Sequence, residues 1–450
     1  MNMLSDESLL EVFNHCQKND PYWLTTWPIW KTLVQVCQRW RRIIFASPQH
    51  LHLQLFCSNK TSASVNVKGS LDIWPQLPIV IYYQRTNWNG DENVIAALER
   101  RDRVTKITCY GLSSSILKKL YALQEPLPGL TDLDLNLWGN WGNLAPVLAE
   151  SFLGGSAPRL RSCTLRGIAF PALPNLLIST SRLVRLDLYD IPDSGYILPD
   201  AMASCLATLP NLEKLTMQFR TPTSRPRSTN SPPLAPAIIP SLIHFNFEGS
   251  SEYLEDLAAR IEAPLLHALC VTFSMDLTFI ISQLLRFVAR SNRLNKLFDA
   301  KVELGPWSVR MTDESWNYLN LGIKYNASSW QISSLVQLCN NLSPLLSQVT
   351  SLSFWEYRVK PEDMEPTQLL AVFLSFSSAT SLSVSGEMVS SVVHALGELT
   401  GERDIEVLPE LGCLCFDGHH PNQSELEESL DPFIDSRRDA DRNIIVLWAQ

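Results

Sequence analysis

Four residues near the end of the chain have the types and the close spacing of a zinc site. They are Cys413, Cys415, His419 and His420, and thiolate and imidazole groups are the usual ligands of tetrahedral zinc. Two observations argue against such a site. Adjacent histidines fit one tetrahedral centre poorly, and Cys415 lies between two apolar residues of a recurring strand pattern described below. We therefore expect ordinary repeat residues here and no bound metal.

A cysteine paired with a histidine is a second possible source of chemistry, because an adjacent imidazole activates a thiol as a nucleophile. The chain has ten cysteines and eight histidines, yet no local motif joins any two of them. It also lacks a glycine-rich phosphate loop, an HExxH helix and a GxSxG elbow. We predict that the protein is not an enzyme and has neither catalytic residues nor a cofactor. A thiol enzyme is the least favoured alternative.

The composition is that of a packed intracellular protein. Of 450 residues, 45% are apolar and 18% charged, and the net charge of −9 argues against a general nucleic-acid binder. There is no CxxC pair and no basic region before an apolar run at the N-terminus. The uncharged stretch between Tyr325 and Trp355 is too rich in Ser, Asn and Gln to span a membrane. We expect a cytoplasmic or nuclear location, with no membrane and no nucleic-acid partner.

Helical periodicity marks the first fifty residues. The segment Thr32–Phe45 is predicted to form one amphipathic helix, with its apolar face at Leu33, Val36, Cys37, Trp40 and Ile44. A second helix precedes it, with apolar residues at Leu9, Val12, Phe13 and Cys16. Two or three short helices bury little apolar surface alone. They form either a cap on the rest of the fold or a docking module that a partner helix completes.

These segments resemble an F-box. The resemblance rests on Leu4–Phe13, on Leu33–Arg41 with its Val-Cys-x-x-Trp-Arg core, and on Ser47-Pro48. Ser5 replaces the usual proline, and the tryptophan-rich segment Asn14–Trp30 is longer than the usual spacer. That insert and Leu71–Pro75 are similar to F-box proteins of mushroom-forming fungi. The resemblance implies docking on a Skp-type adaptor, and through it on cullin and RING subunits. It implies these adaptor-binding residues: Leu4, Leu9, Val12, Phe13, Leu33, Val36, Cys37, Trp40, Ile44 and Pro48. For Trp40, an ordinary core aromatic is the alternative.

A short apolar phrase recurs through the remainder of the chain. It reads apolar, two residues, apolar, one residue, apolar, as in Leu130–Leu135, Leu160–Leu165 and Leu183–Leu188. Further copies open at Leu212, Leu242, Leu266, Val349, Ala379 and Leu411, and weaker ones at Val104, Leu294 and Trp316. The mean period of about 28 residues is typical of leucine-rich repeats. The fold class is therefore α/β: a short helical F-box followed by an irregular leucine-rich-repeat solenoid, a horseshoe with parallel strands on its concave face. An ordinary α/β domain is the alternative, but its strands would be continuous apolar runs.

Helical stretches separate the predicted strands, at Pro199–Leu209, Ser251–Ile261, Leu277–Ala289, Thr367–Leu374 and Glu387–Leu399. We predict an F-box at 1–57, a connecting segment and N-terminal cap at 58–100, and the repeat array at 101–450. A Pro/Ser-rich stretch at 221–237 is predicted to be a flexible loop. The region 424–450 forms a C-terminal cap, in which Pro432 limits any single long helix and Ile444–Trp448 is a closing strand.

The resemblance implies a substrate-recognition subunit of an SCF-type ubiquitin ligase that binds an unidentified protein substrate. An F-box and leucine-rich-repeat scaffold without a ligase role is the alternative. In each strand phrase the apolar pair turns inward, so the residues between and after it face the concave side. This predicts the following substrate-binding residues: Asp134, Asn136, Arg166, Asp187, Tyr189, Gln218, Glu248 and Trp355. The alternative is that this row is solvated and that Trp355 packs on a neighbouring repeat.

Overall fold

The structure is a computed structural model of the whole chain. It describes all residues except 1–3, 19–28, 60–70, 73–76, 86–90, 138–144, 221–234, 275–280, 292–293, 295–297, 306–307, 314–318, 325–330, 357–364, 400–405, 419–420 and 450. Trp23, Trp27, His419, His420, most of the predicted loop and part of Leu71–Pro75 lie outside the described residues. The chain divides into two compact units, Met1–Tyr196 and Ile197–Gln450, and each is described by itself.

The first unit begins with three helices, α1 (Asp6–Lys18), α2 (Ile29–Val36) and α3 (Gln38–Ala46). The prediction of one helix over Thr32–Phe45 is therefore wrong, because the chain breaks at Cys37. The backbone of Cys37 is extended, at φ −159° and ψ 168°, and its Sγ accepts a hydrogen bond from the Trp40 amide at 3.5 Å. Cys37 thus acts as the N-cap of α3. It supplies a hydrogen-bond acceptor to one of the first backbone amides, which have no acceptor within the helix.

The sheet of the first unit has six parallel strands in chain order: β1 (Leu55–Ser58), β2 (Ile79–Gln84), β3 (Val104–Tyr110), β4 (Asp132–Asn136), β5 (Ser162–Arg166) and β6 (Arg185–Ile191). The helices α5 (Asp91–Leu98), α6 (Ser114–Tyr121) and α7 (Leu173–Ile178) and the 3-10 turns η2 (Phe152–Gly155) and η3 (Asp193–Gly195) connect them. The apolar pair of each phrase is in register with the next, as in Leu133, Cys163 and Leu186, and is buried.

The second unit repeats this plan with more strands: α8 (Pro199–Leu206), β7 (Lys214–Phe219), β9 (His244–Gly249), α9 (Ser251–Ala258), β11 (Ala268–Ser274), α10 (Ser282–Ala289), β12 (Asp299–Gly305), β13 (Ser308–Asp313), β14 (Leu319–Lys324), α11 (Gln331–Leu346), β15 (Ser351–Glu356), α12 (Pro366–Phe373), β16 (Ser381–Ser385), α13 (Met388–Gly397), β17 (Cys413–Asp417), α15 (Gln423–Asp439) and β18 (Ile445–Ala449). A small pair, β8 (Ala237–Ile238) and β10 (Ile261–Glu262), lies apart. The predicted loop therefore ends before Ala237.

The prediction of parallel strands fails at one place in this unit. Strand β13 runs antiparallel to both β12 and β14, so the spatial order is β11, β14, β13, β12, β15. Two residues separate β12 from β13, which is the length of a hairpin connection and too short for a parallel crossover. The weak copy opened by Leu294 is also displaced, because β12 begins only at Asp299 and buries Ala300, Val302 and Leu304.

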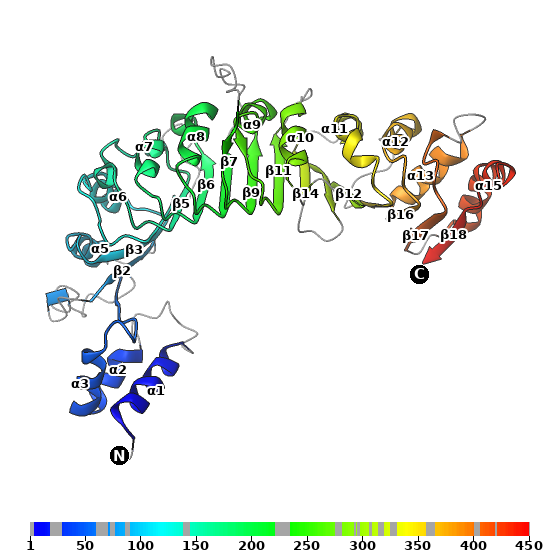
Figure 1. Cartoon of the computed structure of the whole chain (residues 1–450). Coiled ribbons are helices and arrows are strands. Elements are labelled where there is room, and N and C mark those ends of the chain that lie inside the picture. The colour runs from blue at the N-terminus through cyan, green and yellow to red at the C-terminus, as the bar shows by residue number, and fades with distance from the viewer. Residues whose placement is uncertain are drawn as a thin grey trace. The chain divides into compact units, whose positions relative to one another are not determined.

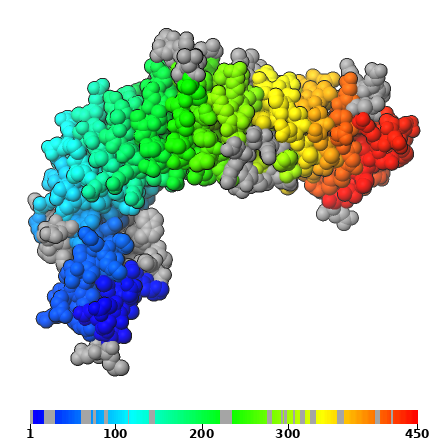
Figure 2. Space-filling model, viewed as in Figure 1, coloured from blue at the N-terminus to red at the C-terminus, as the bar shows by residue number. Residues whose placement is uncertain are grey.

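In each unit the helices lie along one face of the strands (Figure 1). Helix-side positions carry the apolar pairs, which are buried. In the space-filling view, the colours of the second unit follow one another in chain order along the array (Figure 2). We call the opposite face of each sheet its open face. It carries the residues between the apolar pairs, because side chains alternate along a strand. The architecture is that of a leucine-rich-repeat array.

The C-terminal segment closes the second unit. Helix α15 is continuous over Gln423–Asp439 although Pro432 lies inside it, so the prediction that this proline limits a long helix is wrong. Pro432 removes one backbone hydrogen bond, and burial of Leu430, Phe433 and Arg437 against the array offsets that loss. The guanidinium of Arg437 donates to the carbonyl oxygens of Val407, Leu408 and Pro409. Strand β18 pairs in parallel with β17, which confirms the predicted closing strand within one residue.

Among the helices that the structure describes, none combines the length and the apolar character needed to cross a lipid bilayer.

Candidate binding surfaces

The three N-terminal helices present some of the predicted adaptor-binding residues and bury others. Leu4, Val12 and Val36 are exposed, with 53%, 48% and 49% of their surfaces accessible. Leu33, Cys37, Trp40 and Pro48 are half-buried. Leu9, Phe13 and Ile44 are buried in the helical core, so they cannot contact a partner directly and instead hold the exposed residues in place.

Two contacts position this exposed set. The guanidinium of Arg39 donates to the Leu4 carbonyl and to Asp6, both at 2.7 Å, which holds the start of α1 against the start of α3. The rings of Phe13 and Trp40 meet edge-on, with centroids 4.9 Å apart. Trp40 is thus partly a core aromatic. Three further core residues were not predicted: Trp30, Val34 and Ile43. Periodicity could not find them, because they lie on a second helical face that exists only with the break at Cys37.

The open face of the first unit brings five of the predicted substrate-binding residues together. Along one row Asp134, Thr164 and Asp187 are in register, and along the next row Asn136, Arg166 and Tyr189 are in register. The Arg166 guanidinium lies over the Tyr189 ring, 4.3 Å from its centroid, and 3.6 Å from a carboxylate oxygen of Asp190. These residues come from three neighbouring strands and form one continuous patch.

The two carboxylates of this patch are unusually enclosed. Asp187 is 1% exposed, and the Arg185 guanidinium donates to its Oδ2. The hydroxyl of Tyr110 donates to Asp134 Oδ2 at 3.0 Å. Burial raises the pKa of Asp134, while the Tyr110 hydrogen bond and the Arg166 charge oppose the rise. Burial and the neighbouring Asp134 raise the pKa of Tyr110 to about 12, so this hydroxyl remains a donor at neutral pH.

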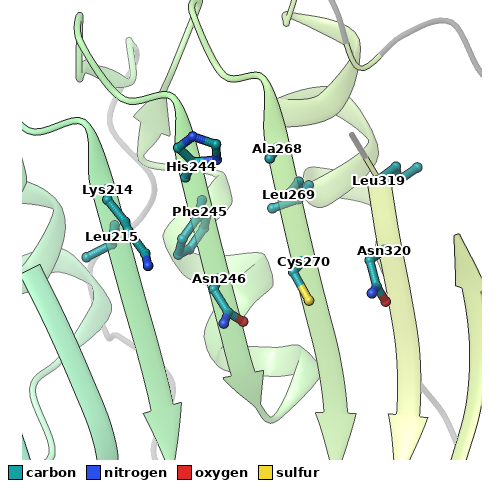
Figure 3. Close-up of a pocket in the computed structure, with 10 residues that line it drawn as sticks. All are labelled: Lys214, Leu215, His244, Phe245, Asn246, Ala268, Leu269, Cys270, Leu319 and Asn320. Carbon is teal, nitrogen blue, oxygen red and sulfur yellow. The ribbon is translucent and has the colours of Figure 1, made fainter. Parts of the chain in front are cut away.

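The open face of the second unit contains a hollow of about 420 Å³. Asn246, Cys270 and Asn320 lie side by side across it on β9, β11 and β14, as their register requires (Figure 3). Lys214, His244 and Ala268 line its upper end, where the strands begin. None of these six is among the predicted substrate-binding residues. The available signal was Ala268, a small side chain in a row of larger ones, which leaves space above the sheet.

The three remaining predicted residues of this unit lie on the same face outside the hollow. Glu248 lies two residues beyond Asn246 on β9 and is paired with Lys324. Gln218 is half-buried on β7. Trp355, on β15, is 48% exposed, and the Lys301 ammonium lies 4.6 Å from the centroid of its ring. The ring of Trp355 therefore contacts the adjacent strand β12 while about half of its surface stays exposed.

Seven thiols of the described chain have a raised pKa, whereas an activated nucleophile has a lowered one. Burial raises the pKa of Cys57 to about 11 and that of Cys163 and Cys205 to about 12. It also raises the pKa of Cys109, Cys270, Cys339 and Cys415. Within the described residues, no three His, Cys, Asp or Glu side chains gather as metal ligands.

Comparison with known proteins identifies no family for this chain. No family model matches the chain, and no curated protein matches it. The solved structure of the leucine-rich repeat-containing protein LegL7 from Legionella pneumophila is similar over 84% of this chain and 97% of its own, with 13% identity and a TM-score of 0.28. A TLR13–ssRNA13 complex is similar over 88% of this chain and 48% of its own, with 13% identity and a TM-score of 0.31. The fold assignment therefore rests on the chain's own strand order and buried phrase residues.

Proposed function

We propose that this protein is the substrate-recognition subunit of an SCF-type ubiquitin ligase. In this proposal the N-terminal helices dock on a Skp-type adaptor, which links them to cullin and RING subunits, and the open faces of the array hold a protein substrate. The protein supplies proximity and forms no bond itself, because holding a substrate beside a catalyst raises its effective concentration.

The observation that carries the proposal is the exposed apolar set on the N-terminal helices. Leu4, Val12 and Val36 lie within the segments that resemble an F-box, and about half of the surface of each residue is exposed. Water-exposed apolar side chains on so small a helical module are suited to a partner helix. The core beneath them, with Phe13 against Trp40, holds the helices together without using those residues.

Support for the second part of the proposal comes from the open faces. The apolar row on the helix side is nearly constant, whereas the open-face row changes from carboxylates to amides, thiols and aromatic residues along the array. A variable surface on a constant scaffold is suited to specific recognition. Tyr189, Arg166 and Trp355 belong to the residue types that most often dominate protein interfaces.

The adaptor contact is tested with the double variant V12D/V36D of the full chain. A buried carboxylate opposite an apolar partner is costly, so we expect at least a tenfold loss of binding to a purified Skp-type adaptor. Both residues are exposed, so the melting temperature should change little. The matched control is I178D, which replaces an apolar residue that is 61% exposed on α7 of the array. Adaptor binding by V12D/V36D equal to that of I178D would contradict the docking surface.

The ligase role is tested separately from adaptor binding. Once a substrate is identified, its half-life is compared in cells that hold the intact chain and in cells that hold a chain lacking residues 1–57. A longer half-life with the truncated chain is expected. If the substrate is still captured and its half-life does not change, the protein is a scaffold without a ligase role.

A further inference from the structure

The hollow on the open face of the second unit is large enough to hold part of a ligand. Its volume is about 420 Å³, which lies within the range of roughly 300–1,000 Å³ that ligand pockets have. Residues of β7, β9, β11 and β14 form its floor (Figure 3). Because the hollow lies on the face opposite the helices, a side chain of a protein partner can enter it from above the sheet.

A lysine at the upper end of the hollow has no counter-charge there. Lys214, His244 and Ala268 are in register on neighbouring strands, so each Cα atom is about 4.8 Å from the next. Within the part of the chain that the structure describes, Lys214 forms no ion pair and the imidazole of His244 forms no hydrogen bond. The residues that line the hollow include no carboxylate. The ammonium group of Lys214 is therefore free to bind an anion that enters from outside.

His244 supplies an imidazole beside this lysine. Burial lowers the pKa of His244, and so do the nearby charges of His267 and Lys214, while Glu213 raises it. Glu213 is exposed, precedes β7 and does not line the hollow. At neutral pH Lys214 thus supplies the charge, and His244 supplies a ring that can donate a hydrogen bond to an anion.

The floor of the hollow supplies neutral donors. Asn246, Cys270 and Asn320 are in register across it, and none of their side chains is hydrogen-bonded within the described chain. Oδ1 of Asn320 is enclosed, which leaves its Nδ2 as the accessible end of the amide. In Figure 3 this nitrogen lies on the side of Asn320 that faces Cys270. Neither amide atom of Asn246 is enclosed, so both asparagines can donate to a group that enters the hollow.

We propose that the hollow binds an anionic side chain of the protein partner, either the carboxylate of an aspartate or glutamate or the phosphate of a phosphorylated residue. Such a group is an acceptor for the lysine ammonium and the asparagine amides, and its charge is opposite to that of Lys214. A cationic side chain would meet Lys214 without a carboxylate to offset the repulsion. An apolar one would leave the amides unpaired. The inference rests on the proposed function in one respect: the open face must bind a protein.

The probe is a peptide that needs the hollow for binding. A phage-displayed random dodecapeptide library is selected on the immobilised full chain and depleted on the variant A268L, whose leucine fills space in the hollow without changing its charge. We expect the retained peptides to share an aspartate or glutamate at one position. The depletion acts through shape and the readout is charge, so the result is not imposed by the selection. If A268L does not fold, A268V takes its place.

Fluorescence anisotropy of one retained peptide then gives its affinity for the intact chain and its variants. K214Q should weaken binding at least tenfold, because it removes the charge opposite the anion. Replacing the peptide's acidic residue by the corresponding amide should weaken binding to the intact chain equally. The same peptide change should alter binding to K214Q less than threefold, because the interaction is already lost there. A phosphoserine at that position identifies the anion: tighter binding than the acidic residue assigns a phosphate, and weaker binding a carboxylate.

The matched control is K301Q. Lys301 lies on the same open face and carries the same charge as Lys214, but it is outside the hollow and pairs with Glu303 at 2.9 Å. K301Q should change the affinity less than threefold. A selection that retains no peptide, retained peptides without a shared acidic residue, or an equal loss in K214Q and K301Q would each overturn the inference. V12D/V36D should bind the peptide as the intact chain does, so failure of adaptor docking is distinguishable from failure of the hollow.

Discussion

The open faces of the two units differ in where they keep their charge. In the first unit Asp187 is buried and Asp134 is half-buried, and each has one carboxylate oxygen that receives no hydrogen bond from the described residues. In the second unit the charged side chains of the open face pair with one another, as Glu248 does with the half-exposed Lys324 and Glu303 with Lys301. The central hollow of the second unit is lined by amides, a thiol and an alanine, with Lys214 and His244 at its upper end and no carboxylate among its lining residues.

This difference shows how one scaffold presents two kinds of recognition surface. The apolar row behind each strand is nearly the same in both units, so the backbone positions are equivalent. Enclosed charges are selective, because they demand an opposite charge to offset their burial. A hollow without carboxylates selects by shape and by the hydrogen bonds of its amides. Measurements made in the same way on both open faces test this difference.

The largest expected contrast is in thiol accessibility. Cys270 lines the hollow of the second unit and is half-buried, whereas Cys163 lies on the helix side of β5 and is fully buried. A maleimide pulse on the folded chain, mapped by mass spectrometry, should label Cys270 and leave Cys163 unlabelled. Since burial raises the pKa of Cys270 above its usual 9.0, its labelling should still increase as the pH rises past 9.

The variant A268L sharpens this contrast by filling the hollow. It should slow the labelling of Cys270 about tenfold, because the leucine occupies the space above the thiol. The control is S274L on the open face at the far end of β11, which should leave the rate unchanged. Equal rates in all three proteins would mean that the hollow is not the route to Cys270.

The ion pairs of the two faces should differ in their effect on stability. R185A leaves the carboxylate of Asp187 buried without its partner and should cost about 2 kcal/mol of unfolding free energy, less than a fully buried pair because Arg185 is half exposed. K324A removes a pair near the surface and should cost less than about 1 kcal/mol. Urea unfolding of both variants gives the comparison. If K324A costs as much as R185A, the two faces do not differ in the enclosure of charge.

The smallest expected effect is that of D134N on stability, and its sign is informative. Because the pKa of Asp134 is raised in the folded protein, its charged form destabilises the folded state. This destabilisation is absent at a pH below the pKa of Asp134 in the unfolded chain, and it is complete at a pH above its pKa in the folded protein. D134N should therefore be as stable as the intact chain or slightly more stable at pH 7, and the difference should vanish as the pH falls below 4. A loss of stability at pH 7 would assign Asp134 to the fold.

The strand array could be predicted because its signal is local and repeated. The phrases opened by Leu130, Leu160 and Leu183 each place two apolar residues on one side of a strand, and those residues are buried. The antiparallel β13 could not be found in this way, since no phrase opens there. A turn signal was present in Gly305 and Pro306, directly after β12.

The break between α2 and α3 had no sequence signal that periodicity could detect. Both helices carry apolar faces, and Cys37 is not a residue type that usually caps a helix. Pro432 predicted a break that the structure does not have, because packing of Leu430 and Phe433 outweighs the lost hydrogen bond. For the binding surfaces, the alternation of side chains along each strand predicted which residues share a face. The burial of Asp187 and the space above Ala268 depend on neighbours two strands away, which no single phrase contains.

The most direct test is quantitative affinity purification from cells, followed by mass spectrometry, with three full-length forms of the protein. They are the intact chain, V12D/V36D, and R166A/Y189A/W355A, which removes the exposed anchors of both open faces. We predict that V12D/V36D loses the Skp-type adaptor with cullin and RING subunits and keeps its substrates, while the triple variant keeps the adaptor and loses substrates. Recovery of the same proteins with all three forms would contradict separate docking and recognition surfaces.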